Sequence, residues 1–461
     1  MFSKDFIWGA ATSAAQIEGA EYEDGKTSSI WDIASRMNDG RFSRFQKTPL
    51  SSCDHYHRFI EDVAIMKKIG LKAYRFSISW TRLMTGDMNT INPKGLLFYN
   101  RLIDALLEAG IEPFITIFHW DYPQSLLDQG GWQNDKSVTW FAEYAKTVVE
   151  LFSDRVKKFI TINEPECFVN LGYLDKRHAP YYQLPEDAVF KIAHNVLKAN
   201  GLATILMRQA AKQKIEIGQA FALTGAIPFS EDDKDINAAK HCFFNHPDSS
   251  FWGTWFLDTI MNGEYDKKRL AKISISPDVL DKDMRIIHQT PDFIGFNMYS
   301  GTLTKHLGEN DYQRMPDPID SDYTMMDIPI APSCLYWAAR FLYEKYHLPI
   351  YIMENGVAIT DSPDENGDID DPARINFIRE HLIHLSRALK EKIDVRGYFY
   401  WSLLDNYEWA HGYSRRFGLV RVNFENYKRT LKKSAYWYAS LIKSNGEILE
   451  KERVDKNYGN L

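Results

Sequence analysis

Thr161-Ile-Asn-Glu-Pro165 and Tyr351-Ile-Met-Glu-Asn-Gly356 each place a glutamate directly after a short apolar run. These runs, Phe159–Ile162 and Pro349–Met353, are typical of buried strands. A glutamate at the end of a buried strand is expected where the strand opens into a cleft. Hydrolysis of a glycosidic bond requires two carboxyl groups, one to protonate the leaving oxygen and one to attack or stabilise the anomeric carbon. The two strings therefore predict sugar cleavage.

Similar apolar runs alternate with amphipathic stretches along the whole chain. The expected strands are Phe6–Thr12, Ala73–Ser79, Glu112–His119, Lys158–Asn163, Glu216–Leu223, Asp292–Tyr299, Leu348–Glu354 and Gly397–Leu403. The expected helices are His57–Ile69, Gly95–Ala109, Ser137–Ser153, Ala188–Gln213, Cys334–Tyr346 and Arg374–Lys392. Eight strands, each followed by a helix, predict an α/β fold, a (β/α)8 TIM barrel with inserted loops. We expect one domain over residues 1–461, with Ala226–Pro291 forming helices and loops without a strand.

Composition narrows the classes of function. The 461 residues carry a formal charge of −7 and no basic block beyond doublets and triplets, which argues against a nucleic-acid partner. No apolar run is long enough to span a membrane, and no signal peptide is recognisable, so a soluble cytoplasmic protein is expected. Its oligomeric state cannot be inferred from the sequence. Four scattered cysteines suggest neither disulfides nor a zinc site, and no nucleotide-binding glycine motif follows a strand, so no metal or cofactor is expected.

Polar residues recur where the expected strands end. In a parallel barrel these ends converge on one face, which is where active sites form. Such a face would therefore gather polar and aromatic groups from seven of the eight strands and from the loop after the last. These are Gln16, Arg75, His119, Trp120, Asn163, Glu164, Asn297, Tyr299, Glu354, Trp401, Glu408 and Trp409.

The motifs that carry these residues resemble the family 1 glycoside hydrolases, which include β-glucosidases, β-galactosidases and 6-phospho-β-glycosidases. The resemblance covers nearly the whole chain, in the family's order. The matching strings are Phe6-Ile-Trp-Gly-Ala-Ala-Thr-Ser-Ala-Ala-Gln16, Tyr74-Arg75-Phe-Ser-Ile-Ser-Trp80, Phe118-His119-Trp120-Asp121, Asn163-Glu164-Pro165, Asp292-Phe-Ile-Gly-Phe-Asn297-Met-Tyr299, Glu354-Asn355-Gly356 and Tyr400-Trp401-Ser-Leu-Leu-Asp-Asn-Tyr-Glu408-Trp409.

The resemblance implies a retaining mechanism with Glu354 as nucleophile and Glu164 as acid/base. Arg75 and Tyr299 would keep Glu354 ionised, while burial and the Glu354 charge would raise the pKa of Glu164. Asn297 would support the nucleophile with them. The other matches imply binding of a non-reducing sugar in an exo-acting β-glycosidase, most simply a β-glucosidase. The implied sugar-binding residues are Gln16, His119, Trp120, Asn163, Tyr299, Trp401, Glu408, Trp409 and Phe417.

Glu408 bears on the class of sugar. Family members that act on 6-phosphosugars carry Ser at this position and a Lys in the following loop, where this chain has Glu408 and Ser414. Because a carboxylate facing a phosphate is unfavourable, the resemblance implies an unphosphorylated sugar. The sequence does not separate glucose from galactose or fucose, nor does it reveal the natural aglycone.

The chain departs from the family on the leaving-group side. Glu166 stands where an aromatic residue, usually Trp, stacks on the leaving group. Lys176 and Tyr181 replace two glycines of the following loop. We expect Glu166 either to lie at the mouth of the cleft and favour polar leaving groups, or to face solvent or pair with Lys176 or Arg177. A transglycosylase with the same residues, a 6-phospho-β-glycosidase and an inert sugar-binding barrel remain as alternatives.

Three other pairs of histidine or lysine residues are expected to have structural or surface roles and no part in catalysis. His55 and His57 are expected to be structural, and His381 with His384 to form a solvated or interfacial helix face. Lys432-Lys433 is expected to be a surface charge pair near the C-terminus.

Overall fold

Eight parallel strands form a closed barrel in the computed structural model, which describes residues 2–37, 51–85, 89–245, 251, 254–266, 277–308, 311–317 and 321–450. The strands follow one another around the barrel in chain order, and the last pairs with the first through Ile7–Gly397 and Ala11–Trp401. The predicted TIM barrel is confirmed. Its strands are β1 (Ile7–Ala11), β2 (Ala73–Ser77), β5 (Glu112–Phe118), β6 (Lys158–Asn163), β7 (Glu216–Ala222), β9 (Phe293–Asn297), β12 (Ile350–Asn355) and β13 (Val395–Trp401).

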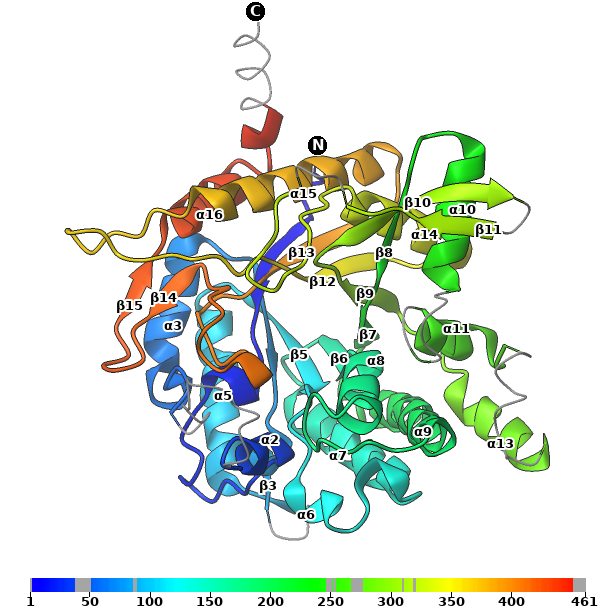
Figure 1. Ribbon diagram of the computed structural model, residues 1–461. Helices are drawn as coiled ribbons and strands as arrows, with labels where there is room; N and C mark the ends of the chain where they lie inside the picture. Colours follow the sequence, from blue (N-terminus) through cyan, green and yellow to red (C-terminus); the bar gives the residue numbers. More distant parts are fainter. Residues whose placement is uncertain are drawn as a thin grey trace, which may run out of the picture.

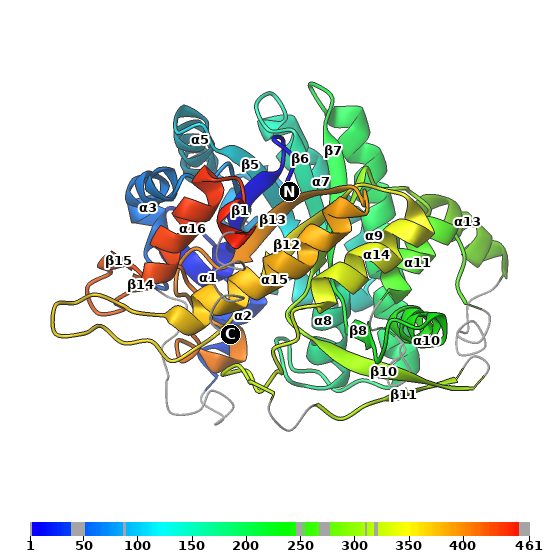
Figure 2. The same ribbon diagram turned by 90° about the horizontal axis from the view of Figure 1, so that it is seen from above.

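Helices lie outside the strands, as the two views of the ribbon show (Figures 1 and 2). All six predicted helices are present, each shifted by at most three residues at either end. The α-helices are α1 (Ala14–Ile17), α2 (Ile30–Ala34), α3 (His55–Ile69), α4 (Trp80–Leu83), α5 (Pro93–Glu108), α6 (Gln124–Leu127), α7 (Ser137–Phe152), α8 (Pro165–Val169), α9 (Glu186–Ala210), α10 (Asp233–Phe244), α11 (Trp255–Asn262), α13 (Pro277–Ile287), α14 (Cys334–Tyr346), α15 (Pro372–Lys390) and α16 (Lys433–Lys443). Single turns occur at η1 (Gly131–Gln133), η2 (Asn170–Leu174) and η3 (Trp409–His411).

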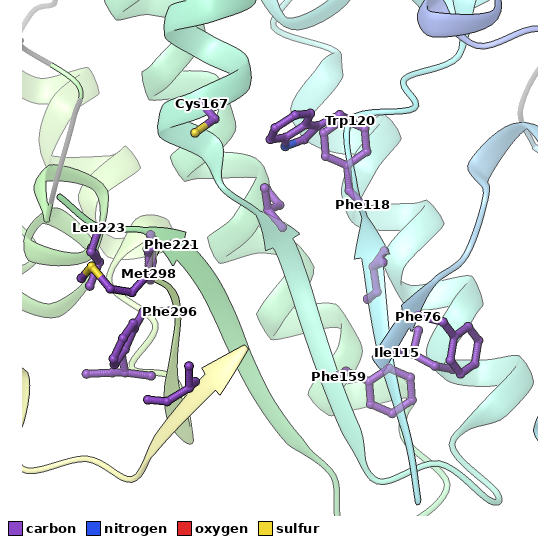
Figure 3. Close-up of a cluster of buried hydrophobic side chains, with 14 of the residues drawn as sticks. Phe76, Ile115, Phe118, Trp120, Phe159, Cys167, Phe221, Leu223, Phe296 and Met298 are labelled. Atoms are coloured by element: carbon purple, nitrogen blue, oxygen red, sulfur yellow. The ribbon is translucent and has the colours of Figure 1, made fainter. Parts of the chain in front are cut away.

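Alternation along the strands produces two hydrophobic cores. Inside the barrel, the Phe114 ring of β5 lies 5.7 Å from Tyr351 of β12 and 4.8 Å from Phe399 of β13, between strands that are not neighbours. Residues that face the other way, such as Phe76 and Ile115, pack between the strands and the helices (Figure 3). Both faces of each strand are therefore buried, which is why the strands read as nearly continuous apolar runs.

Short strands outside the barrel correct the prediction for residues 226–291. This region contains β8 (Gly225–Pro228) as well as helices, so it is not free of strands. The strand β8 pairs in parallel with β10 (Gly301–Gly308), which pairs with β11 (Asp311–Arg314), and α10 packs on this sheet. Because β8 has only four residues, its sequence is too short to show the alternation by which a strand is recognised. Two further ribbons join β3 (Met84–Thr85) to β4 (Thr90–Ile91) and β14 (Val420–Val422) to β15 (Arg429–Leu431).

Two surface predictions were wrong. Lys432 is fully buried, with its amino group 2.5 Å from Asp361 and 2.8 Å from Asp405, whereas Lys433 is exposed. His381 is also fully buried, and its Nδ1 lies 2.8 Å from the Phe377 carbonyl oxygen. The charged partners of Lys432 come from distant segments of the chain, so local sequence did not reveal them, whereas the Phe377 partner of His381 lies one turn earlier on the same helix.

The structural role predicted for His55 fits its surroundings, because its Nδ1 lies 2.7 Å from the Asp62 carboxylate, which also accepts from Arg429. Among the described residues, no helix is both long and apolar enough to cross a membrane.

Candidate active site

Arg75 lies at the centre of the polar groups that the strand ends bring together. From β2, its Nη1 donates to Glu354 Oε1 at 2.6 Å and its Nη2 donates to Asn163 Oδ1 at 2.6 Å. Its Nε donates to Thr116 Oγ1 of β5 at 3.0 Å. The side chain is fully buried, so these bonds replace water as the partners of the guanidinium. Arg75 thus links four strands of the barrel: β2, β5, β6 and β12.

Glu354 has a donor for each carboxylate oxygen. Arg75 binds Oε1, and the Tyr299 hydroxyl donates to Oε2 at 2.7 Å. Burial raises the pKa of Glu354, while Arg75 and Tyr299 lower it. The predicted support of the nucleophile by these two residues is therefore present in the geometry, but it offsets the effect of burial rather than leaving a low pKa.

Gly356, two residues after Glu354, is required by close packing. A Cβ atom at this position would lie 1.7 Å from the Trp401 carbonyl oxygen. The ends of β12 and β13 consequently approach each other more closely than any other residue would permit.

Glu164 is buried in a different environment. It follows β6 as the residue before helix α8, with a left-handed backbone at φ 46°. Its Oε1 accepts from Asn297 Nδ2 at 2.6 Å. Burial and then the Glu354 charge raise the pKa of Glu164 to about 7, while the Asn297 hydrogen bond lowers it. The pKa shift predicted for the acid/base is present, with burial as its largest cause.

Asn163, His119 and Gln16 extend the polar network toward the loop after β13. Asn163 Nδ2 lies 3.2 Å from His119 Nε2, and Gln16 Nε2 donates to Glu408 Oε2 at 3.3 Å. Burial and the Arg75 charge lower the pKa of His119 well below its usual value, so its imidazole is neutral. These groups offer both donors and acceptors, as the hydroxyls of a sugar require.

Aromatic rings line the same region. The His119 imidazole is stacked with the Trp401 ring at 5.9 Å and with the Trp409 ring at 6.0 Å. Trp120 lies 4.7 Å from Trp409, and the Phe417 ring is 6.2 Å from Tyr299. The predicted stacking floor and pocket residues are therefore assembled at one end of the barrel.

Glu408 is a partly buried carboxyl at this pocket. Burial raises its pKa to about 8, with contributions from the negative charges of Glu354 and Glu164. The raised pKa favours the protonated form of Glu408, which can donate a hydrogen bond as well as accept one.

The structure corrects the two expectations for Glu166. Its side chain is fully buried, and no side chain among the described residues forms a hydrogen bond or an ion pair with its carboxyl group. It therefore neither lies at the mouth of a cleft nor faces solvent, and it does not pair with Lys176 or Arg177. Burial and the nearby Glu164 raise the pKa of Glu166 well above 4.5, against a lowering by backbone hydrogen bonds, so the neutral form of this carboxyl is favoured. The sequence placed it correctly next to Glu164 but carried no signal for its orientation.

The two glycine replacements in the following loop occupy left-handed backbone positions. Lys176 has φ 53° and Tyr181 has φ 61°, a region in which side chains other than glycine are strained. His178, between them, packs 5.4 Å from Trp31 and 5.5 Å from Trp120. The altered loop thus remains connected to the aromatic rings of the site.

Several supporting residues were missed. Thr116 binds Arg75, Ser13 donates to Gln16 Oε1 at 2.7 Å, and Asn406 Oδ1 accepts from Gln16 at 3.2 Å. The signal for Thr116 was available, because it is a polar residue within the apolar β5 run and on the same face as Phe114. Among the described residues, no cluster of three or more His, Cys, Asp or Glu side chains is placed to hold a metal ion.

Comparisons with known proteins agree with this arrangement. The model of the family described as Glycosyl hydrolase family 1 matches residues 1–447. Beta-glucosidase A of Thermotoga maritima is 40% identical over 449 residues, which cover 96% of this chain and 98% of that protein. An aryl-phospho-beta-D-glucosidase of Bacillus subtilis is 35% identical over 480 residues, covering 97% and 98%. The solved structure of the Thermotoga maritima beta-glucosidase in complex with glucoimidazole superposes with a TM-score of 0.86 at 40% identity, covering 96% of this chain and 99% of that one.

The burial of Glu166 predicts a pH-dependent cost to stability. A carboxyl whose pKa is raised by folding favours the folded state below pH 4.5, and this contribution is lost progressively as pH rises toward the folded-state pKa. Each pKa unit corresponds to about 1.4 kcal/mol. Glu166→Gln should therefore unfold at nearly the same temperature as the wild type at pH 4.5 and at a higher temperature at pH 8. The control is Glu425→Gln at an exposed position, where the difference should not grow with pH; equal pH profiles for Glu166→Gln and wild type would contradict the buried neutral acid.

Proposed function

The chain belongs to glycosyl hydrolase family 1 and is a glycoside hydrolase, and we propose that it is a retaining, exo-acting β-glucosidase for unphosphorylated β-D-glucosides. In this proposal Glu354 is the nucleophile and Glu164 the acid/base. The whole chain, 1–461, serves as a single catalytic domain. The names of its relatives support β-glucosidase activity, while the assignment of individual residues rests on the site described above.

The observation that carries the proposal is the contrast between the two carboxyl groups. Glu354 lies 2.6 Å from a guanidinium group, which favours its ionised form. Glu164 lies next to an amide group instead and has a pKa of about 7. Two carboxyls in environments that separate their protonation states are what acid-assisted attack on a glycoside requires.

In the first step, a Glu354 oxygen attacks the anomeric carbon and Glu164 donates its proton to the departing oxygen. The bond between the anomeric carbon and the aglycone breaks, and a glycosyl ester on Glu354 forms. Arg75 and Tyr299 position Glu354 through its two oxygens, so little reorganisation is needed for the attack.

In the second step, water replaces the ester. Formation of the ester removes the negative charge of Glu354, which is one of the causes of the raised pKa of Glu164. Glu164 therefore ionises more easily and takes a proton from a water molecule. The oxygen of that water attacks the anomeric carbon. Glu354 is released as a carboxylate, and two displacements return the original β-configuration.

Asn297 supports retention rather than inversion. Its amide donates to Glu164, and it lowers the pKa of Glu354 as well as that of Glu164. One short side chain within reach of both carboxyls favours the separation of about 5–5.5 Å used by retaining enzymes over about 6.5–9.5 Å.

Sugar recognition is assigned to the remaining polar and aromatic groups. Gln16, His119 and Asn163 would bind hydroxyls, with Glu408 contributing a further polar group. The rings of the pocket would contact the apolar faces of the sugar; these are Trp120, Tyr299, Trp401, Trp409 and Phe417.

Covalent trapping tests Glu354. A 2-deoxy-2-fluoro-β-glucoside with an activated leaving group should form a stable ester, because the fluorine slows hydrolysis of the intermediate. Mass spectrometry should find one label per chain on Glu354 in the wild type and in Glu166→Gln. Glu354→Gln should remain unlabelled, with kcat lowered by several orders of magnitude. A label on another carboxylate would refute the assignment.

The pH profile tests Glu164. Because the acid must be protonated, kcat/KM for a substrate with a poor leaving group should fall above pH 7, near its pKa of about 7. Glu164→Ala should remove this limb, and it should lose far more activity on poor leaving groups than on activated aryl glucosides. Added azide should then restore turnover and yield a β-configured product. Equal losses for all leaving groups would show that Glu164 is not the acid.

Glu408 tests the class of sugar. We expect kcat/KM for an aryl β-glucoside to exceed that for its 6-phosphate, because the pocket already contains several carboxyl groups. The preference should increase above pH 8, where Glu408, with its pKa of about 8, becomes ionised. Glu408→Ser should reduce the preference. A wild-type preference for the phosphate would make the 6-phospho-β-glycosidase alternative correct.

A further inference from the structure

Arg374, in the first turn of α15, is a fully buried arginine outside the site described above. Its guanidinium makes six hydrogen bonds. Two are ion pairs, with Asp371 at 2.8 Å and Asp361 at 2.9 Å. Of the other four, three are directed at the two loops that leave β12 and β13, and one is directed at the Tyr400 hydroxyl of β13.

The first loop follows Glu354, the proposed nucleophile, which is the last residue but one of β12. Arg374 Nη1 donates to the carbonyl oxygen of Val357 at 2.5 Å, and Val357 is the third residue after Glu354. The bond therefore holds the backbone just beyond the end of β12.

The second loop carries the wall of the sugar pocket. Arg374 Nη1 also donates to the Phe417 carbonyl oxygen at 3.0 Å, and Nη2 donates to that of Arg416 at 3.2 Å. The Tyr400 hydroxyl accepts from Arg374 at 3.1 Å and donates to the same Phe417 oxygen at 3.0 Å. The Phe417 ring, in turn, lies 6.2 Å from Tyr299, which binds Glu354.

Neighbouring charges hold the second loop in place from behind. Asp405 Oδ2 accepts from Arg416 at 2.8 Å, and its Oδ1 accepts from the Gly418 amide at 2.9 Å. Lys432 bridges Asp405 to Asp361, the carboxylate that binds Arg374. One buried network thus joins α15, the loop after β12 and the loop after β13.

We propose that Arg374 is a positioning residue for the reaction, which holds the loop after β12, directly behind Glu354, and the loop after β13, which carries Phe417, in register so that the sugar pocket keeps its shape. The inference rests on the proposed function of Glu354 and Phe417, since Arg374 itself does not touch the substrate. A planar guanidinium can donate in several directions at once, whereas a lysine at this position offers a single compact ammonium. Loss of this geometry would let the two loops move independently.

Replacement of Arg374 should impair the part of the site that binds the sugar, and not the part that protonates the leaving group. A displacement of about 1 Å at a reacting group can lower the rate about 100-fold. Glu164 follows β6 and Asn297 ends β9, and no bond described for Arg374 reaches them. The loss should therefore be the same for good and poor leaving groups, unlike that expected for a Glu164 variant.

Arg374→Lys is the first test, measured on folded protein. We expect kcat/KM for aryl β-glucosides to fall about 10–100-fold, equally for activated and poor leaving groups, and the inhibition constant of glucose to rise about tenfold. The pH above which kcat/KM falls should be unchanged, because Glu164 keeps its surroundings. A lower melting temperature with wild-type kcat/KM and wild-type glucose inhibition would overturn the proposal and leave Arg374 a purely structural residue.

Two further variants keep the test decisive if Arg374→Lys does not fold. Tyr400→Phe removes one hydroxyl from the network and should give the same pattern in milder form, about fivefold in kcat/KM. Arg429→Lys is the matched control, because Arg429 is a buried arginine paired with Asp62; it should lower stability without changing glucose inhibition. Unchanged kinetics in Tyr400→Phe would count against the proposal. Failure of the proposed function is distinguishable, because the wild type would then neither hydrolyse aryl β-glucosides nor bind glucose.

Discussion

The 2.6 Å ion pair between Arg75 and Glu354 sets the charge balance of the active site. Three further carboxyls lie close to this pair. The charge of Glu354 raises the pKa of Glu164 and of Glu408, and the charge of Glu164 raises the pKa of Glu166. The buried guanidinium of Arg75 offsets part of the effect of burial on Glu354, while burial favours the protonated form of the other three carboxyls. The charge of Arg75 thus distinguishes Glu354 from the carboxyls around it.

Local backbone geometry fixes where these groups point. Glu164, Trp120 and Trp409 all have positive φ, at 46°, 72° and 47°. Such conformations cost of order 1–3 kcal/mol each and persist where the surrounding packing determines them. Neighbouring aromatic rings supply part of that packing, because the Trp409 ring lies 4.7 Å from Trp31 and 4.7 Å from Trp120. Side chains at the strand ends can thus be held in strained positions that an isolated loop would relax.

The sequence predicted most of the barrel because each strand is a local pattern of apolar residues, and it predicted the site because the strand ends must meet. Three kinds of feature were not accessible in the same way. The strand β8 was too short to show alternation. Lys432 is charged and lies next to another lysine, yet its partners Asp361 and Asp405 are supplied by distant segments. Glu166 follows Glu164 closely in sequence, but its burial depends on how α8 packs. Burial of a charged side chain is a property of the tertiary structure.

The network around Arg374 has a different energetic character from the hydrophobic cores. Asp361, Asp371 and Asp405 are fully or almost fully buried with their cationic partners, and desolvation offsets much of the attraction in such clusters. A hydrophobic filling of the same volume would stabilise the fold about as well, but it could not bind the backbone oxygens of Val357, Arg416 and Phe417. Directional bonds to these oxygens fix two loops at once, one that follows Glu354 and one that carries Phe417. The buried charges thus contribute mainly to the geometry of the pocket, whereas apolar packing supplies the stability that allows it.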